Sequence, residues 1–188
     1  MSTIRISHPL RRAQRRAQAG ITLVETMTVT AVLAIVASVA TPGFNGSVQR
    51  RHLEGAVAQL ETDIHYTRSL AVARNQPLRI SFASDAAASC YVIHTGSANQ
   101  CACAADGSAV CQGSAEALRS VRFAAAESVG LSANARSVLV DPVRGTVIPT
   151  ATVQFRADNG MALNQVVNIL GRVRTCSPGG TLSGHPRC

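Results

Sequence analysis

A 20-residue apolar run close to the N-terminus, residues 21–40, constrains this chain more than any other feature. It reads ITLVETMTVTAVLAIVASVA and carries one charged residue, Glu25. A helix needs about 20 residues to cross a bilayer, so the run is long enough to span a membrane. Residues 1–20 hold five arginines and no acidic residue. Because clustered cations stay on the cytoplasmic side, the sequence predicts that everything after the run is exported.

Two kinds of export signal compete for this segment. An ordinary secretory signal would be cut after the small-x-small triplet at residues 38–40. A prepilin leader would be cut between Gly20 and Ile21, before the apolar run. Glu25 distinguishes the two signals. Placing a carboxylate at the centre of a membrane helix costs about 2.5–3.5 kcal/mol of insertion free energy, and a signal peptide that is discarded has no function for such a residue. An intramembrane acid indicates a functional site with a partner, which favours the prepilin leader.

Residues 19–25, AGITLVE, resemble the type IV prepilin signature. In that signature a glycine before the cleavage point is followed by an apolar residue, Thr-Leu-x-Glu and a long apolar run. Ile21 departs from it, since phenylalanine is usual there. The resemblance implies cleavage between Gly20 and Ile21 by a prepilin peptidase and N-methylation of Ile21. It also implies that Glu25 pairs with the N-terminal amine of a neighbouring subunit.

The same resemblance implies where the protein resides and what it contacts. It is expected in the inner membrane as a single-pass protein with a periplasmic C-terminal domain, and in a pilus or pseudopilus after assembly. Its expected partners are other pilin subunits, the prepilin peptidase and the inner membrane.

A second helical segment is predicted after a break at residues 42–47, where Pro42, Gly43 and Gly46 interrupt the pattern. From about residue 48 to 74, side chains recur at spacings of three and four, which places them on one helix face. They are Leu53, Val57, Leu60, Ile64, Thr67 and Ala71. Residues 75–77, Asn-Gln-Pro, end the helix. Residues 21–41 are therefore the predicted membrane or filament-core half, and residues 48–188 the predicted exported domain.

Beyond residue 77 the pattern changes to the alternation typical of strands. Candidate strands are residues 78–82, 90–94, 118–123, 137–140, 152–156 and 165–170. Strands that follow a helix without alternating with helices indicate an α+β fold, here a long N-terminal helix packed on antiparallel β-sheets. Residues 95–117 are rich in Ala, Gly, Ser and Cys, and a long loop pinned by disulfides is expected there.

Six cysteines lie in the C-terminal half of the chain, at positions 90, 101, 103, 111, 176 and 188. An even number in an exported chain indicates disulfides. Cys176 and Cys188 flank a short tail and are expected to bond to each other. The other four, Cys90, Cys101, Cys103 and Cys111, are expected to pair among themselves, with Cys101–Cys103 the least favoured pair because a C-x-C bridge is strained. Zinc is the rival explanation, but no CxxC pair occurs, so no metal is expected.

The sequence contains no recognisable catalytic motif. The chain has no lysine for a phosphate-binding Walker loop, and HExxH, GxSxG and GxGxxG are absent. Its five histidines are scattered. Neither enzymatic activity nor a cofactor is expected. Without residues 1–20 the net charge is only +3, so overall charge does not by itself indicate nucleic-acid binding.

Two further segments resemble the FimT/GspH family of minor pilins and pseudopilins. Residues 66–78, YTRSLAVARNQPL, look like its junction between the helix and the first strand, and residues 171–174, GRVR, with Cys176 and Cys188 look like the tail of the FimT branch. The resemblance to that branch implies DNA binding during natural transformation. The alternative is a structural minor pseudopilin of a type II secretion system, or a subunit that starts pilus assembly, without DNA binding.

The candidate DNA contacts are Gly171, Arg172, Arg174 and Arg187. Arg172 and Arg174 are two residues apart, which in extended backbone places both guanidinium groups on one side. A Cys176–Cys188 bond would bring Arg187 near them. Such forks suit phosphate, and aromatics are too scarce for base stacking. Binding should therefore be directed at the backbone and independent of sequence. Three contacts would give a log–log salt slope of about −3 on duplex DNA.

Overall fold

The computed structural model describes residues 20–85, 88–104, 106–124 and 128–188, without the side chains of residues 40–43. The predicted leader, residues 1–20, lies outside the described part except for Gly20. The chain divides into two compact units with a boundary between Thr41 and Pro42. One helix, α1 (Leu23–Arg74), contributes its first part to the N-terminal unit and the rest to the C-terminal unit.

In the N-terminal unit, α1 begins with a capped first turn. The Glu25 N–H donates to Thr22 Oγ1 at 3.3 Å. A Thr followed three residues later by Glu is the capping-box pattern, and a carboxylate in the first turn also interacts favourably with the helix dipole. The apolar side chains of this segment are exposed, Ile21 by 75%. No single helix in the described residues is long and apolar enough to span a membrane; the segments Leu23–Val39 and Phe44–Arg74 meet that requirement only as a pair.

The break predicted at residues 42–47 could be a kink or a short melted stretch. These residues are helical within α1 (Leu23–Arg74), so a melted stretch is not observed. Proline inside a helix removes one hydrogen bond and crowds the preceding turn, which kinks a helix without necessarily ending it, and glycine adopts helical angles at a cost of about 1 kcal/mol. The predicted end at residues 75–77 is correct. Asn75 adopts a positive φ of 48°, and the Gln76 N–H bonds the Ala71 carbonyl at 3.1 Å, which closes the helix.

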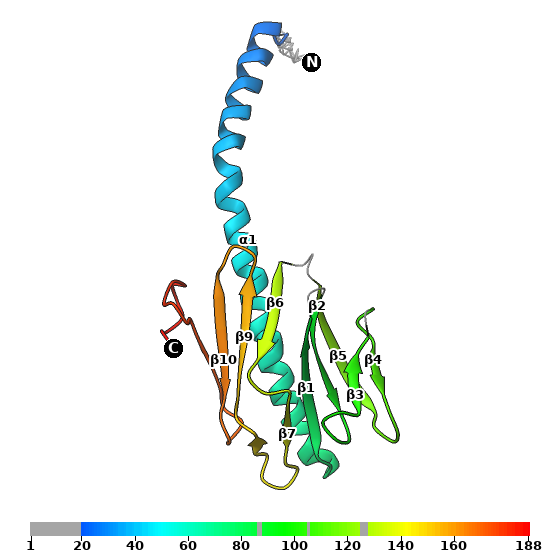
Figure 1. Cartoon of the computed structure of the whole chain (residues 1–188). Coiled ribbons are helices and arrows are strands. Elements are labelled where there is room, and N and C mark those ends of the chain that lie inside the picture. Colours follow the sequence, from blue (N-terminus) through cyan, green and yellow to red (C-terminus); the bar gives the residue numbers. More distant parts are fainter. Residues whose placement is uncertain (1–19, 86–87, 105, 125–127) are drawn as a thin grey trace, which may run out of the picture. The chain divides into compact units, whose positions relative to one another are not determined.

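Three antiparallel sheets make up the rest of the described C-terminal unit (Figure 1). A five-stranded sheet has the order β5-β2-β1-β7-β8, with β5 (Ala117–Ala124), β2 (Ala88–His94), β1 (Leu78–Ser84), β7 (Ser137–Val140) and β8 (Val147–Ile148). A four-stranded sheet has the order β11-β10-β9-β6, with β11 (Val173–Cys176), β10 (Ala162–Val167), β9 (Ala151–Ala157) and β6 (Val129–Ala133). A small hairpin pairs β3 (Cys101–Cys103) with β4 (Ala109–Cys111). The α+β class predicted from the sequence is thus the observed one.

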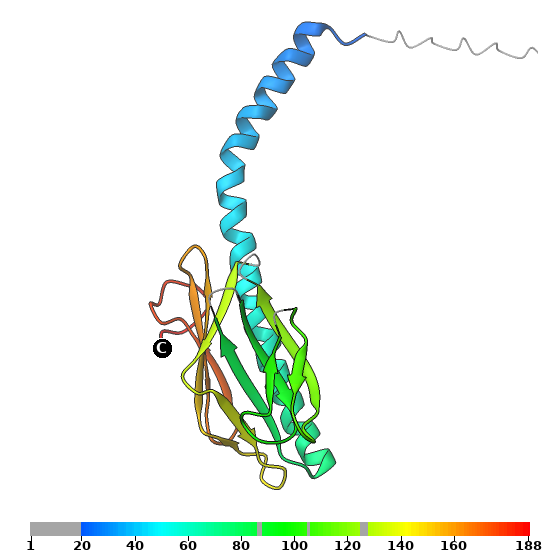
Figure 2. The same ribbon diagram turned by 45° about the vertical axis from the view of Figure 1, so that its right-hand side comes forward.

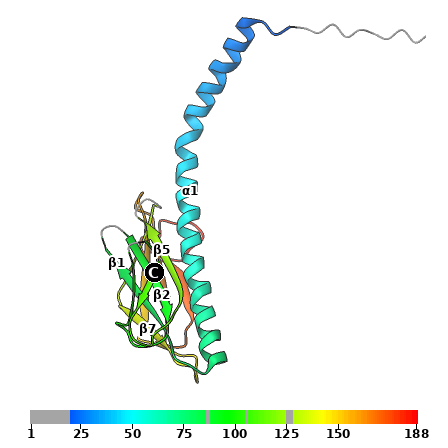
Figure 3. The same ribbon diagram turned by 90° about the vertical axis from the view of Figure 1, so that its right-hand side faces the viewer.

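The C-terminal part of α1 packs along one face of the two large sheets (Figures 2 and 3). The predicted helix face is the buried one, and Leu53, Leu60 and Ile64 are at most 1% exposed. They meet inward side chains of both sheets, including Tyr91 and Phe155. Burial of a side chain of this size contributes about 1.5–3 kcal/mol, so this seam holds the helix to the sheets.

Two strand predictions need correction. Residues 95–117, expected to be a loop, contain the β3–β4 hairpin, which is tied down by the disulfides Cys90–Cys103 and Cys101–Cys111. Residues 165–170, expected to be the final strand, leave the sheet at Val167, and β11 follows as the last strand of the described residues. The reason is the turn at residues 168–172, which includes Arg172 and reverses the chain before β11.

Candidate functional site

A tight turn between β10 and β11 presents the first predicted DNA-contacting arginine. The Asn168 N–H donates to the Arg172 carbonyl at 3.1 Å, and the Gly171 N–H donates to the Asn168 carbonyl at 2.8 Å. The Asn168 side chain adds a third bond, because its Oδ1 accepts the Arg172 N–H at 2.9 Å. Gly171 has a φ of +69°, a left-handed conformation that glycine adopts without strain. The turn is therefore fixed by backbone and side-chain bonds, and Arg172 projects from a defined position.

Arg68 fastens this turn to the helix. Its Nε donates to the Gly145 carbonyl at 3.0 Å and its Nη1 donates to the Gly171 carbonyl at 3.4 Å. One helix side chain thereby joins the turn after β7 to the turn before β11. Sequence reasoning missed Arg68 as part of the site, because nothing in its spacing indicates which distant carbonyls it bonds.

Arg172 and Arg174 line one groove. The groove has a volume of about 420 Å³, and its other lining residues are Val166, Asn168 and Val173. Arg174 lies on β11 opposite Val166 of β10. Both arginines are exposed, and neither forms an ion pair within the described residues. Two permanent cations on a rigid support are thus available to an anion.

Arg187 lies apart from that groove. The disulfide Cys176–Cys188 joins the two cysteines that the sequence pairs, and a parallel bridge sets Arg187 opposite Ser177. Its side chain extends over Gly180: a Cβ placed on that glycine would lie 3.7 Å from Arg187 Cδ. Arg187 does not line the groove of Arg172 and Arg174. Two of the three predicted arginines thus line this groove, and Arg187 lies opposite Ser177, three residues after Arg174.

The C-terminal tail is also anchored to the helix. Arg50 Nη2 donates to the Ser183 carbonyl at 2.6 Å, and Arg50 Nε pairs with Glu54 at 2.8 Å. His185 Nε2 lies 3.6 Å from the same carboxylate. The hydrogen bond from Arg50 holds the pKa of Glu54 below its usual value. Neither Arg50 nor Glu54 was singled out from the sequence, although an i, i+4 Arg–Glu pair is a recognisable helix signal.

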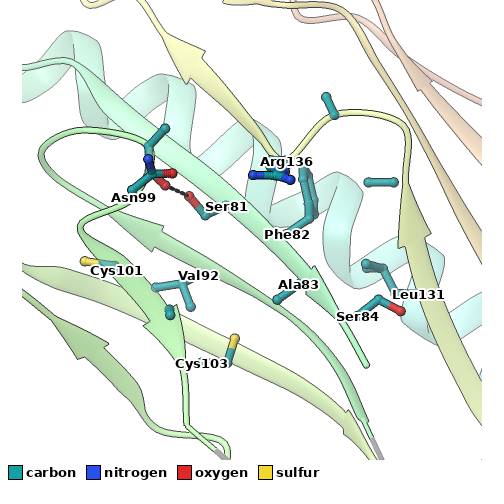
Figure 4. A pocket seen from close by; sticks show the side chains of 14 residues that line it. Ser81, Phe82, Ala83, Ser84, Val92, Asn99, Cys101, Cys103, Leu131 and Arg136 are labelled. Atoms are coloured by element: carbon teal, nitrogen blue, oxygen red, sulfur yellow. Dashed lines mark hydrogen bonds between the residues drawn. The ribbon is translucent and has the colours of Figure 1, made fainter. Parts of the chain in front are cut away.

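A cavity of about 560 Å³ over β1 raises the question of catalysis (Figure 4). Ser81 lines it and contacts His94, with Oγ and Nε2 2.8 Å apart; His94 Nδ1 lies 2.8 Å from the Thr95 carbonyl. The imidazole is wholly buried, and burial lowers its pKa. A histidine shut away from the cavity cannot exchange protons with a substrate there. We interpret the pair as a satisfied buried contact.

The remaining predicted site residues are placed as follows. Gly20, Ile21 and Glu25 are exposed at the start of the N-terminal unit. All six cysteines are in disulfides. In the residues that the structure describes, no group of three or more His, Cys, Asp or Glu side chains is arranged to hold a metal.

Sequence and structure comparisons identify related proteins. The sequence matches the family described as Type II transport protein GspH over residues 56–171, and the Prokaryotic N-terminal methylation motif over residues 15–41. No curated protein matches the chain. A similar solved structure is the minor pseudopilin EpsH from the Type 2 Secretion System of Vibrio cholerae. It is 12% identical, with a TM-score of 0.45, over 68% of this chain and 98% of that one.

Proposed function

The chain belongs to the GspH family of type II transport proteins, and on that premise we propose that it is a minor type IV pilin that binds DNA. In this proposal the leader is removed before Ile21 and the protein is held in the inner membrane by its N-terminal helix. It then assembles with other pilins into a pilus or at its tip. There the C-terminal arginines grip DNA during uptake for natural transformation, and no catalytic step is assigned to the subunit.

The observation that carries this proposal is the exposed arginine pair in one groove. Arg172 and Arg174 are fixed by the turn at residues 168–172, by the β10–β11 ladder and by Arg68. These contacts fix the backbone that carries both arginines, and the planar guanidinium fork suits phosphate. Because neither has a carboxylate partner in the described residues, neither must break an ion pair first.

The pair alone implies weak binding. Two phosphate contacts account for about −2 of the log–log salt slope on duplex DNA. This is less than the slope expected from three arginines, because Arg187 lies outside the groove. Tight binding therefore depends on several subunits, or on other contacts of the filament, which raise the effective concentration of DNA at each site.

The test is a fluorescence titration of the full chain, in detergent micelles, with a labelled 20-base-pair duplex at several salt concentrations. Arg172→Gln combined with Arg174→Gln should weaken binding strongly and flatten the salt slope by about 2. Circular dichroism and disulfide mapping should match wild type. Equal binding by the double variant and wild type would locate the DNA contact elsewhere.

A structural minor pseudopilin is the second candidate, and one observation favours it. The match to the family ends at Gly171, immediately before the arginines. The features common to the family are therefore those of the helix and sheets. If wild type does not bind DNA even at low salt, this second function is the better one. The two arginines would then be a solvated end of the sheet.

A further inference from the structure

The strands of the four-stranded sheet carry arginines and amides on their outer face, and none of these four strands contains a carboxylate. Along β9 and β10 alternate side chains are buried, and Gln165 shows which face they occupy, because its Nε2 donates to the Val57 carbonyl of α1 at 2.7 Å. The intervening side chains therefore point to the opposite face. Figure 3 shows α1 running along one side of the strands. The sequences of β6, β9, β10 and β11 contain no Asp or Glu.

Among the other three strands of this sheet, β6, β9 and β10, the cationic residue is Arg156. It lies on β9, opposite Ala162 of β10 and Gly130 of β6, and it is exposed. Its Nη2 donates to Gln154 Oε1 at 3.1 Å, and it forms no ion pair within the described residues.

A short row of amides lies between Arg156 and the C-terminal arginines. Gln154 Nε2 donates to Asn164 Oδ1 at 3.1 Å, which links β9 to β10 across the middle of the sheet. Asn164 lies opposite Cys176 on β11. Asp158, in the turn after β9, lines one hollow together with Arg156 and Asp85, so carboxylates begin where the strands end.

Strand register gives the scale of this surface. Arg174 lies opposite Val166 on β10, and Arg156 lies opposite Ala162 on the same strand. Four residues at about 3.4 Å each, and two strand spacings of about 4.8 Å, place the two arginine Cα atoms roughly 17 Å apart on the diagonal. One strand of a duplex carries a phosphate for about every 3.4 Å of axis, so this diagonal spans about five phosphates.

We propose that Arg156 is a third DNA contact, and that the DNA backbone crosses the outer face of the four-stranded sheet instead of meeting only the C-terminal turn. The inference rests on the proposed DNA binding and adds the path of the ligand. The occupant is a phosphodiester backbone, because the face offers permanent cations at both ends of the diagonal and no carboxylate on its strands. The amides between them hydrogen-bond a sugar–phosphate chain without reading its sequence.

The experiment is the same titration of the full chain with the labelled duplex. Wild type should show a salt slope of about −3, and Arg156→Gln a slope of about −2 with threefold to tenfold weaker binding at moderate salt. Arg156→Lys, which keeps the cation, should keep the slope. Arg51→Gln removes an equivalent exposed charge from α1, on the other face of the sheets, and should leave the slope unchanged.

The outcomes separate this inference from the proposed function. If Arg156→Gln binds as wild type does while the Arg172–Arg174 double variant fails, DNA binding stands and the path across the sheet is wrong. If Arg51→Gln flattens the slope equally, the effect is general charge and the path is likewise wrong. Vesicles containing phosphatidylglycerol present phosphate on a lipid surface. Arg156-dependent binding to them without any to the duplex would make this a membrane face and overturn the inference.

Discussion

Arg68 and Gly171, 103 residues apart in sequence, are in direct contact. Arg68 Nη1 donates to the Gly171 carbonyl at 3.4 Å, and the guanidinium occupies the space where a side chain at position 171 would begin. A Cβ built on Gly171 would lie only 2.7 Å from Arg68 Cδ, closer than real Cβ contacts allow. A side chain at position 171 would therefore displace the Arg68 guanidinium from this contact, and the positive φ of Gly171 disfavours one independently.

Gly171→Ala should consequently damage the site without changing its charge. The left-handed φ alone costs about 1–2 kcal/mol for a residue with a Cβ, and the collision with Arg68 adds to it. We expect a loss of unfolding free energy above 1 kcal/mol in urea titrations, together with weaker DNA binding. Gly160→Ala is the matched control, because Gly160 has a φ of +85° and open space around it. An equal loss in both variants would mean that the contact with Arg68 contributes nothing.

Asp63 should be the most costly buried polar side chain to truncate. It is 1% exposed, accepts the Tyr91 hydroxyl hydrogen bond at 2.6 Å and pairs with Arg119 Nε at 3.0 Å. Asp63→Ala leaves the buried Tyr91 hydroxyl, whose pKa is raised by burial, without its hydrogen-bond acceptor. We expect the free energy of unfolding to fall by about 3 kcal/mol. The half-exposed Arg119 should contribute the smallest share of this loss. Tyr91→Phe should then lower the free energy of unfolding less in the Asp63→Ala background than in the wild-type protein. Full additivity in this double-mutant cycle would show that the two side chains are not coupled.

The features predictable from sequence were those with a local periodic signal. The buried face of α1 and the strands β1, β2, β5, β7 and β9 each repeat with the period of their element, and residues 75–77 mark the helix end by their composition. The strand predicted at residues 165–170 begins three residues earlier as β10, and β11 was not predicted. Strands β3, β4 and β8 have two or three residues each and no such period. In β6 the buried Val129 and Leu131 alternate with the exposed Gly130 and Ser132, but two apolar positions are too short a signal to identify a strand. Disulfides hold β3 and β4, while β6 and β8 are positioned by pairing with β9 and β7.

The same distinction between local and distant signals applies to the candidate site. The spacing of Arg172 and Arg174 predicted that both guanidinium groups lie on one side, because alternation along a strand is local. The position of Arg187 depends on how the tail folds between two bonded cysteines, and the role of Arg68 depends on carbonyls 77 and 103 residues away. Contacts between residues so far apart in sequence produce no local sequence pattern, so only the structure could identify them.

Cleavage of the leader is predicted between Gly20 and Ile21. Mass spectrometry of the protein from its native membrane should show Ile21 at the N-terminus with one additional methyl group. Gly20→Asp should block cleavage, because a side chain at that position obstructs the peptidase, and the unprocessed chain should accumulate. A mature N-terminus at Thr41 would instead indicate an ordinary signal peptide.

Glu25 has two candidate roles that one substitution separates. As the third helical residue it belongs to the Thr22 cap, and as a charge it would pair with the N-terminal amine of a neighbouring subunit. Glu25→Gln preserves the capping-box pattern and removes the charge. We expect normal membrane insertion of Glu25→Gln and Glu25→Ala, and poor incorporation of both into filaments, measured by immunoblotting of sheared filaments. Wild-type incorporation of the glutamine variant alone would assign Glu25 to the cap.

The buried His94 should make stability depend on pH. Burial chiefly lowers the pKa of its imidazole, and the nearby cation Arg79 acts in the same direction. In the unfolded chain a histidine titrates at about 6.5. The unfolded state therefore binds a proton before the folded state does, and the contribution of His94 to stability is present above pH 6.5 and is lost as the pH falls below it. Urea unfolding with intact disulfides should show a lower unfolding free energy at pH 5 than at pH 7.5, by up to about 1.4 kcal/mol per pH unit. His94→Gln keeps hydrogen-bonding capacity towards Ser81 and cannot titrate, so it should flatten this dependence. If the two proteins lose the same stability between these pH values, the titrating group is not His94.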